Sequence, residues 1–158
     1  MKNGKSFAPR TLVDFKFYPY TKNNIKKLKE HNFMIFVITN QPDIGNKLLK
    51  KNTLDQMHNK IKKFTLVDGI SACLHSQKNM CNCRKPKPKM INDIVNKYNI
   101  NILRSFMVGD RASDILAGKS AGCKTIFIDR NYSELKPKMQ DFTVKSMNQA
   151  VITILNNC

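Results

Sequence analysis

Short apolar runs alternate along this chain with longer stretches in which apolar residues recur every three or four positions. Four continuous runs stand out, at residues 33–38, 70–74, 105–110 and 125–129. Because these runs lack regular alternation with polar residues, they predict strands of a parallel sheet that are buried on both faces. Residues 142–144 predict a short fifth strand.

The stretches between the runs have the spacing of amphipathic helices. Pro19 suits the start of the first helix, Ile25 and Leu28 give it an apolar stripe, and residues 31–32 end it. The same spacing predicts further helices at residues 45–64, 90–98, 112–122 and 147–155, the first of them with a break that Asn52 or Thr53 can cap. Regular alternation of helix and strand predicts an α/β fold, a three-layer Rossmann-like parallel sheet with helices on both faces.

The chain has 158 residues, which is the length of one domain with a real hydrophobic core. The sequence contains no apolar run of about 18 residues and no apolar segment at its N-terminus, so we expect neither a membrane span nor a secretory signal. These features predict a cytoplasmic protein with a single domain, residues 1–158.

The charge balance is extreme, because 28 Lys and Arg against 11 Asp and Glu give a formal net charge of +17. Such a balance is typical of proteins that bind nucleic acid or acidic membranes. The lysines are scattered over the predicted helix faces, without interleaved aromatic residues or a recognised nucleic-acid motif. We therefore attribute the charge to compositional drift that also attracts a small anionic substrate, expect no membrane partner, and keep nucleic acid as the lesser alternative.

Four potential zinc ligands lie within a short stretch, where Cys73 and His75 are followed by Cys81 and Cys83. The whole chain has five cysteines and three histidines, so chance clustering is a poor explanation. Zinc prefers four nitrogen or sulfur ligands in a tetrahedron, and two close pairs joined by a short loop supply them. Since all four positions are filled by protein, we expect a structural zinc and not a catalytic one.

Two cations, Arg84 and Lys85, follow the second cysteine pair directly. A solvated basic run is the ordinary fate of such residues in a lysine-rich chain. A closed metal loop would instead fix the neighbouring backbone. It would then hold the planar guanidinium of Arg84 and the compact ammonium of Lys85 in place, and both groups suit phosphate.

Polar residues also follow two of the predicted strands. Asp110 ends one of them, where α/β proteins place their sites, and its carboxylate suits Mg²⁺. Asp114, in the first turn of the next helix, is explained equally well as a favourable charge at a helix N-terminus. Thr39, Asn40 and Gln41 follow the other strand, and their hydroxyl, amide and backbone N–H groups can hold phosphate oxygens.

Taken in chain order, these segments resemble the haloacid dehalogenase (HAD) superfamily of phosphatases. The resemblance covers residues 15–130, and within the superfamily it is to the branch of heptose bisphosphate and histidinol-phosphate phosphatases. It rests on the Thr-Asn-Gln of residues 39–41, the Gly-Asp of residues 109–110 with Asp114, and the Cys-x-His…Cys-x-Cys-Arg-Lys-Pro segment of residues 73–86. The last of these is specific to the branch, whereas the others occur across the superfamily.

The resemblance implies a Mg²⁺-dependent phosphomonoesterase that acts on a small sugar phosphate through an aspartyl-phosphate intermediate. It implies catalytic contacts of Thr39 and Lys85 with the phosphoryl group, with Asn40 and Gln41 beside them. The other implied roles are substrate contact by Arg84 and Arg111, Mg²⁺ ligation by Asp110 with support from Asp114, and structural zinc ligation by Cys73, His75, Cys81 and Cys83.

The sequence departs from the family near its beginning. The family's first strand carries Asp-x-Asp-Gly, which supplies the nucleophile and the general acid, whereas the first acidic residue here is Asp14, without a second aspartate at that spacing. Residues 1–10 resemble the loop that follows this strand in some relatives. We therefore expect a chain that is truncated relative to the family and does not turn substrate over. Residues 45–47, Gly-Asn-Lys, also replace the family's usual Ala-Arg-Gly.

Three interpretations stay open. The first is a sugar-phosphate phosphatase whose nucleophile strand lies outside this sequence. The second is an inactive relative that still binds zinc and a phosphorylated ligand. The third is a basic zinc-binding module for nucleic acid.

Overall fold

The computed structural model describes residues 8–158, which form two compact units, residues 8–81 and residues 82–158. Residues 1–7, which the sequence predicts to be part of a loop, lie outside the described residues. Within the described residues, no helix is both long enough and apolar enough to cross a bilayer.

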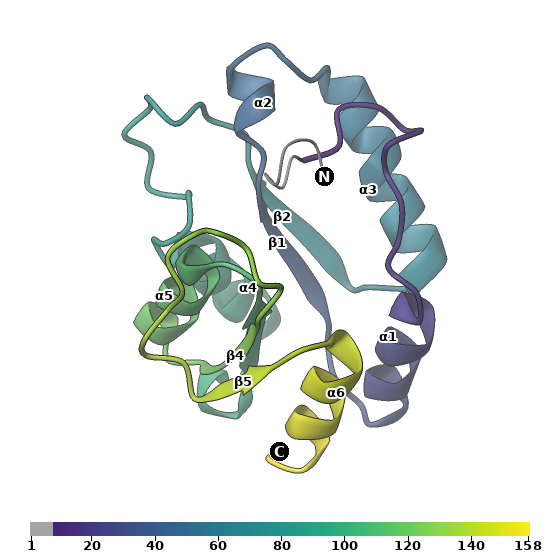
Figure 1. The fold of residues 1–158 in the computed structure, drawn as a ribbon, viewed down its shortest axis with the longest axis vertical. Coiled ribbons are helices and arrows are strands. Elements are labelled where there is room, and N and C mark those ends of the chain that lie inside the picture. The colour runs from purple at the N-terminus through teal and green to yellow at the C-terminus, as the bar shows by residue number, and fades with distance from the viewer. Residues whose placement is uncertain (1–7) are drawn as a thin grey trace. The chain divides into compact units, whose positions relative to one another are not determined.

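The unit of residues 8–81 contains a two-stranded parallel sheet, in which β1 (Phe36–Asn40) pairs with β2 (Gly69–Cys73) (Figure 1). The strand predicted at residues 33–38 therefore begins later and runs on through Thr39 and Asn40. The prediction of full burial is wrong for β1, whose five residues are all half-buried. Its only paired neighbour among the described residues is β2, so it is covered less than a strand in the middle of a sheet.

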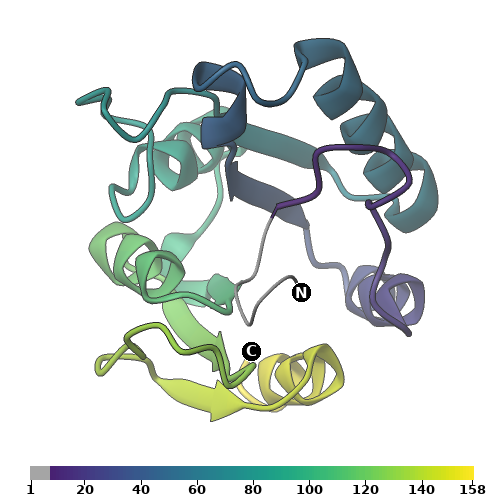
Figure 2. The ribbon, with the colours of Figure 1, turned by 45° about the horizontal axis from the view of Figure 1, so that its top comes forward.

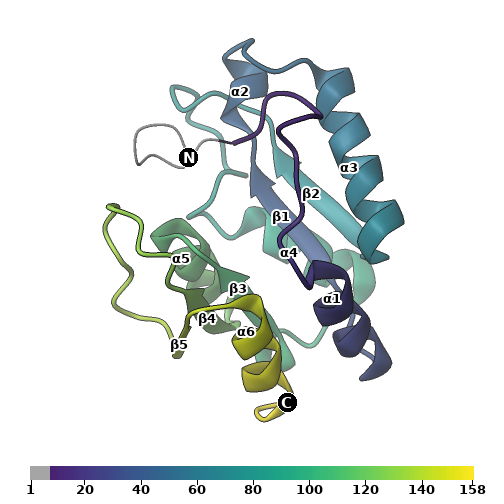
Figure 3. The ribbon, with the colours of Figure 1, turned by 45° about the vertical axis from the view of Figure 1, so that its right-hand side comes forward.

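Two helices of this unit, α1 (Thr21–Glu30) and α3 (Lys51–Thr65), pack against one another (Figures 1 and 3). The stripe predicted on α1 is confirmed, because Ile25 and Leu28 are buried. Phe17, in the irregular segment before α1, stacks on Phe64 of α3 with 4.2 Å between the ring centroids.

The helix predicted at residues 45–64 is two helices, α2 (Pro42–Gly45) and α3, so the predicted position of the break is wrong. The break lies at residues 46–50, where the backbone N–H groups of Leu48 and Leu49 both donate to the carbonyl of Asp43. This turn brings Leu49 into a buried cluster with two apolar residues of α3, Leu54 and Met57.

The unit of residues 82–158 contains a three-stranded parallel sheet of β3 (Phe106–Gly109), β4 (Lys124–Ile128) and β5 (Phe142–Val144), with β4 in the middle. Residues 125–128 are all buried. Because successive side chains of a strand point to opposite faces, both faces of β4 are covered, and the predicted burial of this strand is confirmed. β3 is only half-buried, as expected for a strand with a single paired neighbour among the described residues.

Helices cover this second sheet. α5 (Ala112–Ala121) contacts β3 and β4, and α6 (Met147–Leu155) contacts β4 and β5 (Figure 2). α4 (Lys89–Tyr98) contacts α5, and a short 3₁₀ turn, Ile102–Arg104, precedes β3.

The small residues of α5 allow close packing on the sheet. A Cβ atom on Gly118 would overlap the side chains of Met107 and Thr125. The predicted α/β fold with parallel strands and helices is thus confirmed. The described strands form two hydrogen-bonded sheets and not one continuous sheet.

Candidate functional site

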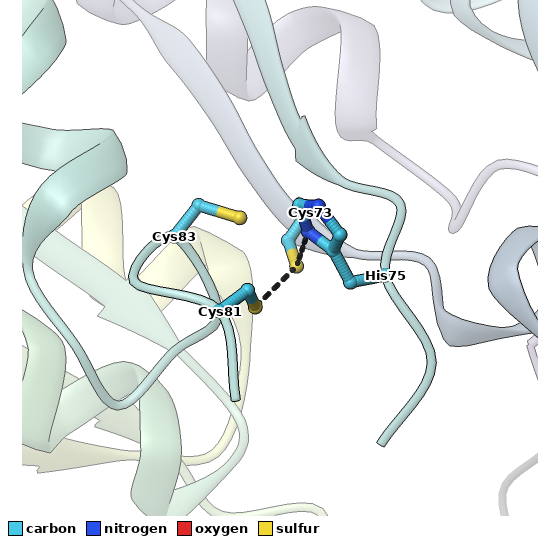
Figure 4. Close-up of side chains that lie close together, drawn as sticks. All are labelled: Cys73, His75, Cys81 and Cys83. Atoms are coloured by element: carbon cyan, nitrogen blue, oxygen red, sulfur yellow. Dashed lines mark hydrogen bonds between the residues drawn. The ribbon is translucent and has the colours of Figure 1, made fainter. Parts of the chain in front are cut away.

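The four predicted zinc ligands come together at the end of β2 and in the loop that follows it (Figure 4). Cys73 is the last residue of β2 and has no exposed surface, and the other three are more exposed. The four ligand atoms, three sulfurs and one imidazole nitrogen, all lie within 4.8 Å of one another. The Sγ atom of Cys73 is 3.6 Å from that of Cys81 and 3.7 Å from Nδ1 of His75.

These separations fit a tetrahedral metal site. With Zn–S bonds of about 2.3 Å, two sulfurs on a tetrahedron are about 3.8 Å apart, and a sulfur–nitrogen edge is slightly shorter. All five cysteines of the chain are free thiols, so no disulfide competes for the four positions. The donor set and its spacing are therefore compatible with zinc.

The end of α2 contacts the loop that carries these ligands. A Cβ atom on Gly45, the last residue of α2, would overlap the backbone nitrogen of Ser76, so only glycine permits this approach. Asn46 donates from Nδ2 to Oε1 of Gln77 at 2.8 Å. The departure at residues 45–47 from the family's pattern therefore lies against the cysteine loop.

A turn closes the loop between the two ligand pairs. The backbone N–H and the hydroxyl of Ser76 both donate to Oδ1 of Asn79, at 3.0 and 2.6 Å. Local side-chain-to-backbone hydrogen bonds of this kind satisfy backbone groups and restrict the chain. The turn helps to keep the two ligand pairs at a fixed separation.

Lys85 forms an ion pair with Asp114 in which Nζ and Oδ1 are 2.7 Å apart. Each side chain exposes only 10% of its surface, so Lys85 does not belong to a solvated basic run. Oδ2 of Asp114 also accepts from the backbone N–H of Arg111 at 3.1 Å, at the first turn of α5. Asp114 thus has the predicted place at a helix N-terminus, and in addition a cationic partner that the sequence did not predict.

Gly109 makes room for this pair. A Cβ atom at this position would overlap the side chain of Asp114. The Gly-Asp sequence therefore lets the first turn of α5 fold back on the end of β3. Arg84, the neighbour of Lys85, is half-buried.

Asp110 follows β3 directly, as predicted, and accepts a hydrogen bond at Oδ2 from the hydroxyl of Tyr132 at 3.1 Å. Its neighbour Arg111 forms an ion pair with Glu134 and lies 5.4 Å from the centroid of the Tyr132 ring. Burial lowers the pKa of the Arg111 guanidinium, but the hydrogen bond and charge of Glu134 and the charge of Asp110 outweigh it, and the net shift is upward.

A second carboxylate, Asp129, follows β4 in the same way that Asp110 follows β3. Its Oδ2 atom is 2.8 Å from Nζ of Lys136 and 2.9 Å from Nζ of Lys145. These two ammonium groups and the backbone N–H of Asn131 hold the pKa of the Asp129 carboxyl well below its usual range. Asp129 is thereby an anchor for the segment that begins after it.

The sequence predictions did not include the partners of Asp110 and Arg111 from the segment after β4. Tyr132 and Glu134 lie more than 20 positions further along the chain, in a segment without helical or strand periodicity. The available signal was Asp129, because a carboxylate at the end of a predicted strand marks the same sheet edge as Asp110.

The other predicted phosphate contacts belong to the unit of residues 8–81. Thr39 and Asn40 are the last residues of β1 and not part of the loop after it. Gln41 donates from its backbone N–H to the carbonyl of Cys73 at 2.8 Å and from Nε2 to Oγ1 of Thr39 at 3.1 Å. These bonds tie the end of β1 to the start of the cysteine loop.

Comparison with known proteins identifies the family. Residues 82–149 match the model of the HAD-hydrolase-like family. A D-glycero-beta-D-manno-heptose-1,7-bisphosphate 7-phosphatase of Helicobacter pylori (strain 26695) is 32% identical over 117 residues, which are 70% of this chain and 68% of that protein. The enzyme of the same name from Neisseria meningitidis (strain Z2491) is 34% identical over 106 residues, 64% of this chain. That match spans only 57% of the length of the Neisseria protein.

A solved structure shows the same fold. The D,D-heptose 1,7-bisphosphate phosphatase of B. bronchiseptica, complexed with magnesium and phosphate, matches with a TM-score of 0.85 and 23% identity. The match covers 94% of this chain and 89% of that one. The chain therefore belongs to the HAD-like hydrolases, and its similarity within them is to the heptose bisphosphate phosphatases.

Proposed function

We propose that this chain is the substrate-binding part of a HAD-type phosphatase. The proposed substrate is a small sugar phosphate of the heptose bisphosphate kind. The observation that carries the proposal is the ion pair of Lys85 and Asp114, in which both side chains are largely shielded from water. The pair lies at the turn that presents Asp110. A desolvated lysine is a strong electrostatic partner for phosphate, because little water screens its charge. The relatives named above support the substrate class.

The roles within this proposal follow the chemistry of each side chain. Lys85 neutralises phosphoryl charge, and Asp114 holds Lys85 in place until the substrate binds. Arg84 and Arg111 contact the anionic substrate, as guanidinium groups suit phosphate oxygens. Thr39, Asn40 and Gln41 donate hydroxyl, amide and backbone N–H groups to the phosphoryl group.

Two metal ions belong to the proposal. Asp110 suits Mg²⁺, because its carboxylate is a hard oxygen ligand and only its Oδ2 atom is engaged by Tyr132. When bound there, Mg²⁺ would polarise the phosphoryl oxygens. Cys73, His75, Cys81 and Cys83 would hold a structural zinc that fixes the backbone before Arg84 and Lys85.

The nucleophile is a separate question. HAD enzymes use an aspartate of an Asp-x-Asp motif, and these 158 residues contain no such motif. We propose that the chain as printed binds a phosphorylated sugar without turning it over. Binding without turnover also describes an inactive relative, so the two interpretations share this property.

The test measures binding and turnover on one sample. Calorimetric titration with a heptose bisphosphate in Mg²⁺ is expected to show binding that Lys85→Met weakens and that Lys89→Met, on the exposed surface of α4, leaves unchanged. Phosphate release is expected to be absent. Release that depends on Mg²⁺ and is abolished by Asp110→Ala would show that another group acts as nucleophile, and absence of any binding would refute the proposal.

A further inference from the structure

The segment that follows β4, residues 129–136, lies beside the end of β3 and lines a small hollow with it. Asp110 and Arg111 are also among the residues that line it. Every element of this hollow lies in the unit of residues 82–158. Neither the sequence predictions nor the relatives' names assign a role to this segment.

Tyr132 contacts two adjacent residues of the Gly-Asp-Arg turn, Asp110 and Arg111. Its hydroxyl donates to Oδ2 of Asp110 at 3.1 Å, while its ring lies under the guanidinium of Arg111 at 5.4 Å. The ring is half-buried, so the phenol is held in a defined place. One side chain therefore orients both the carboxylate and the cation beside it.

The contacts also keep Asp110 and Arg111 from neutralising one another. The two residues are adjacent in the chain and carry opposite charges, so they attract one another. Glu134 binds Arg111 in an ion pair, and Tyr132 engages one oxygen of Asp110. A carboxylate that pairs with arginine is largely lost to a cation, so this separation preserves Asp110 as a ligand.

The base of the segment is fixed. Asp129 is only 9% exposed, binds Lys136 and Lys145, and accepts from the backbone N–H of Asn131 at 2.9 Å. Lys136 thus closes the segment back on its own first residue. A segment closed in this way can hold the phenol of Tyr132 at a constant position relative to β3 and β4.

We propose that Tyr132 is a positioning residue for Asp110, which orients the carboxylate for a divalent cation and screens it from Arg111. This inference rests on the proposed function, because it assumes that Asp110 is a cation ligand. Outer-shell hydrogen bonds to metal ligands typically change metal affinity by about 10- to 100-fold when they are removed. Tyr132→Phe removes the hydroxyl and keeps the ring against Arg111.

The experiment is a Mg²⁺ titration of the full chain, labelled with ¹⁵N and observed through the backbone amides of Gly109, Asp110 and Arg111. We expect Tyr132→Phe to weaken the apparent Mg²⁺ affinity by about tenfold or more. The matched control is Tyr20→Phe, which removes the hydroxyl of an exposed tyrosine in the other unit and should leave the affinity unchanged. The thermal midpoint should be the same for all three proteins, so that loss of structure does not explain the result.

A second variant tests the screening separately. Glu134→Gln releases Arg111 toward Asp110 and is expected to weaken Mg²⁺ binding, although the phenol is intact. Equal Mg²⁺ affinities of the wild type and Tyr132→Phe would overturn the inference and leave the proposed function standing. If Mg²⁺ shifts none of the three amides in any protein, Asp110 is not a cation ligand, and both the inference and the proposed metal site fail.

Discussion

The cysteine loop of residues 73–83 and the surroundings of Asp110 are built in opposite ways. The cysteine loop gathers four soft ligands from one short piece of chain, with separations that leave space for a metal ion between them. Around Asp110 the charged groups already have partners, because Lys85 binds Asp114, and Glu134 binds Arg111. The first region thus offers a site for an ion that the chain does not supply, whereas the second is stabilised by its own ion pairs. Metal removal should therefore lower the stability of the first region, whereas substitution of single charged residues should lower the stability of the second.

The largest effect is expected from the loss of zinc. The binding free energy of structural zinc sites is on the order of 10 kcal/mol, so chelation should lower the stability of the chain more than any substitution discussed below. Metal analysis is expected to find about one zinc per chain, and Cys81→Ser should abolish it. Cys158→Ser, at the exposed last residue, is the matched control and should retain the metal. A purified protein without zinc, with all its cysteines reactive to a thiol reagent, would contradict this prediction.

The next effect concerns the ion pair beside Asp110. Lys85→Met leaves Asp114 with a buried charge and no ammonium partner, which we expect to cost about 3 kcal/mol in the free energy of unfolding. The control is Lys89→Met, because the pair of Lys89 and Asp93 is more than half exposed on both sides and should contribute less than about 1 kcal/mol. Both values come from urea denaturation. Equal losses for the two variants would mean that the environment of Lys85 is not desolvated.

How far the sequence predicts these regions depends on the distance along the chain between the residues involved. The clustering of Cys73, His75, Cys81 and Cys83 was predictable, because their spacing is local and zinc ligands are restricted to a few residue types. Asp110 was predictable from its place at the end of an apolar run. Tyr132 and Glu134 were not, because contacts over more than 20 residues depend on how the segment after β4 folds back, and that segment carries no periodic signal.

The strands show a similar limit. Their existence followed from continuous apolar runs, but β1 begins three residues later than its run and extends into polar Thr39 and Asn40. Pairing with β2 decides these ends, since Asn40 lies opposite Cys73 in the register. A backbone ladder continues wherever its partner continues, even when the side chains turn polar.

Two glycines allow a direct comparison of how tightly each region is packed. Gly45→Ala would place a methyl group against the backbone of the cysteine loop, and Gly109→Ala would place one against the side chain of Asp114. Overpacking of this kind typically costs about 1 to 3 kcal/mol. We expect the larger loss for Gly45→Ala, because a backbone bound at both ends moves less easily than a side chain.

The measurement combines urea denaturation with zinc analysis. Gly45→Ala should lower both stability and zinc content, whereas Gly109→Ala should lower stability alone. Zinc loss in the Gly109 variant would mean that the two regions are not independent in stability.

The smallest effect near neutral pH is expected from titration of Asp129. Its pKa in the folded chain lies below the value of about 3.9 for a free aspartate, because two lysines favour the charged form. The folded state therefore binds fewer protons than the unfolded state, so the contribution of Asp129 is complete above about pH 5 and is lost as the pH falls below about 4. Zinc release begins at a higher pH, because protons compete with the metal for thiolate and imidazole ligands, whose ordinary pKa values lie above that of aspartate. On acidification we thus expect zinc release first, followed by loss of structure in residues 129–136, observed through their backbone amides.

Asp129→Asn should remove the pH dependence of this loss of structure and leave the pH of zinc release unchanged. If the variant and the wild type lose the segment at the same pH, the lysine pairs of Asp129 do not anchor it, and the rigidity on which the role of Tyr132 depends must come from another contact.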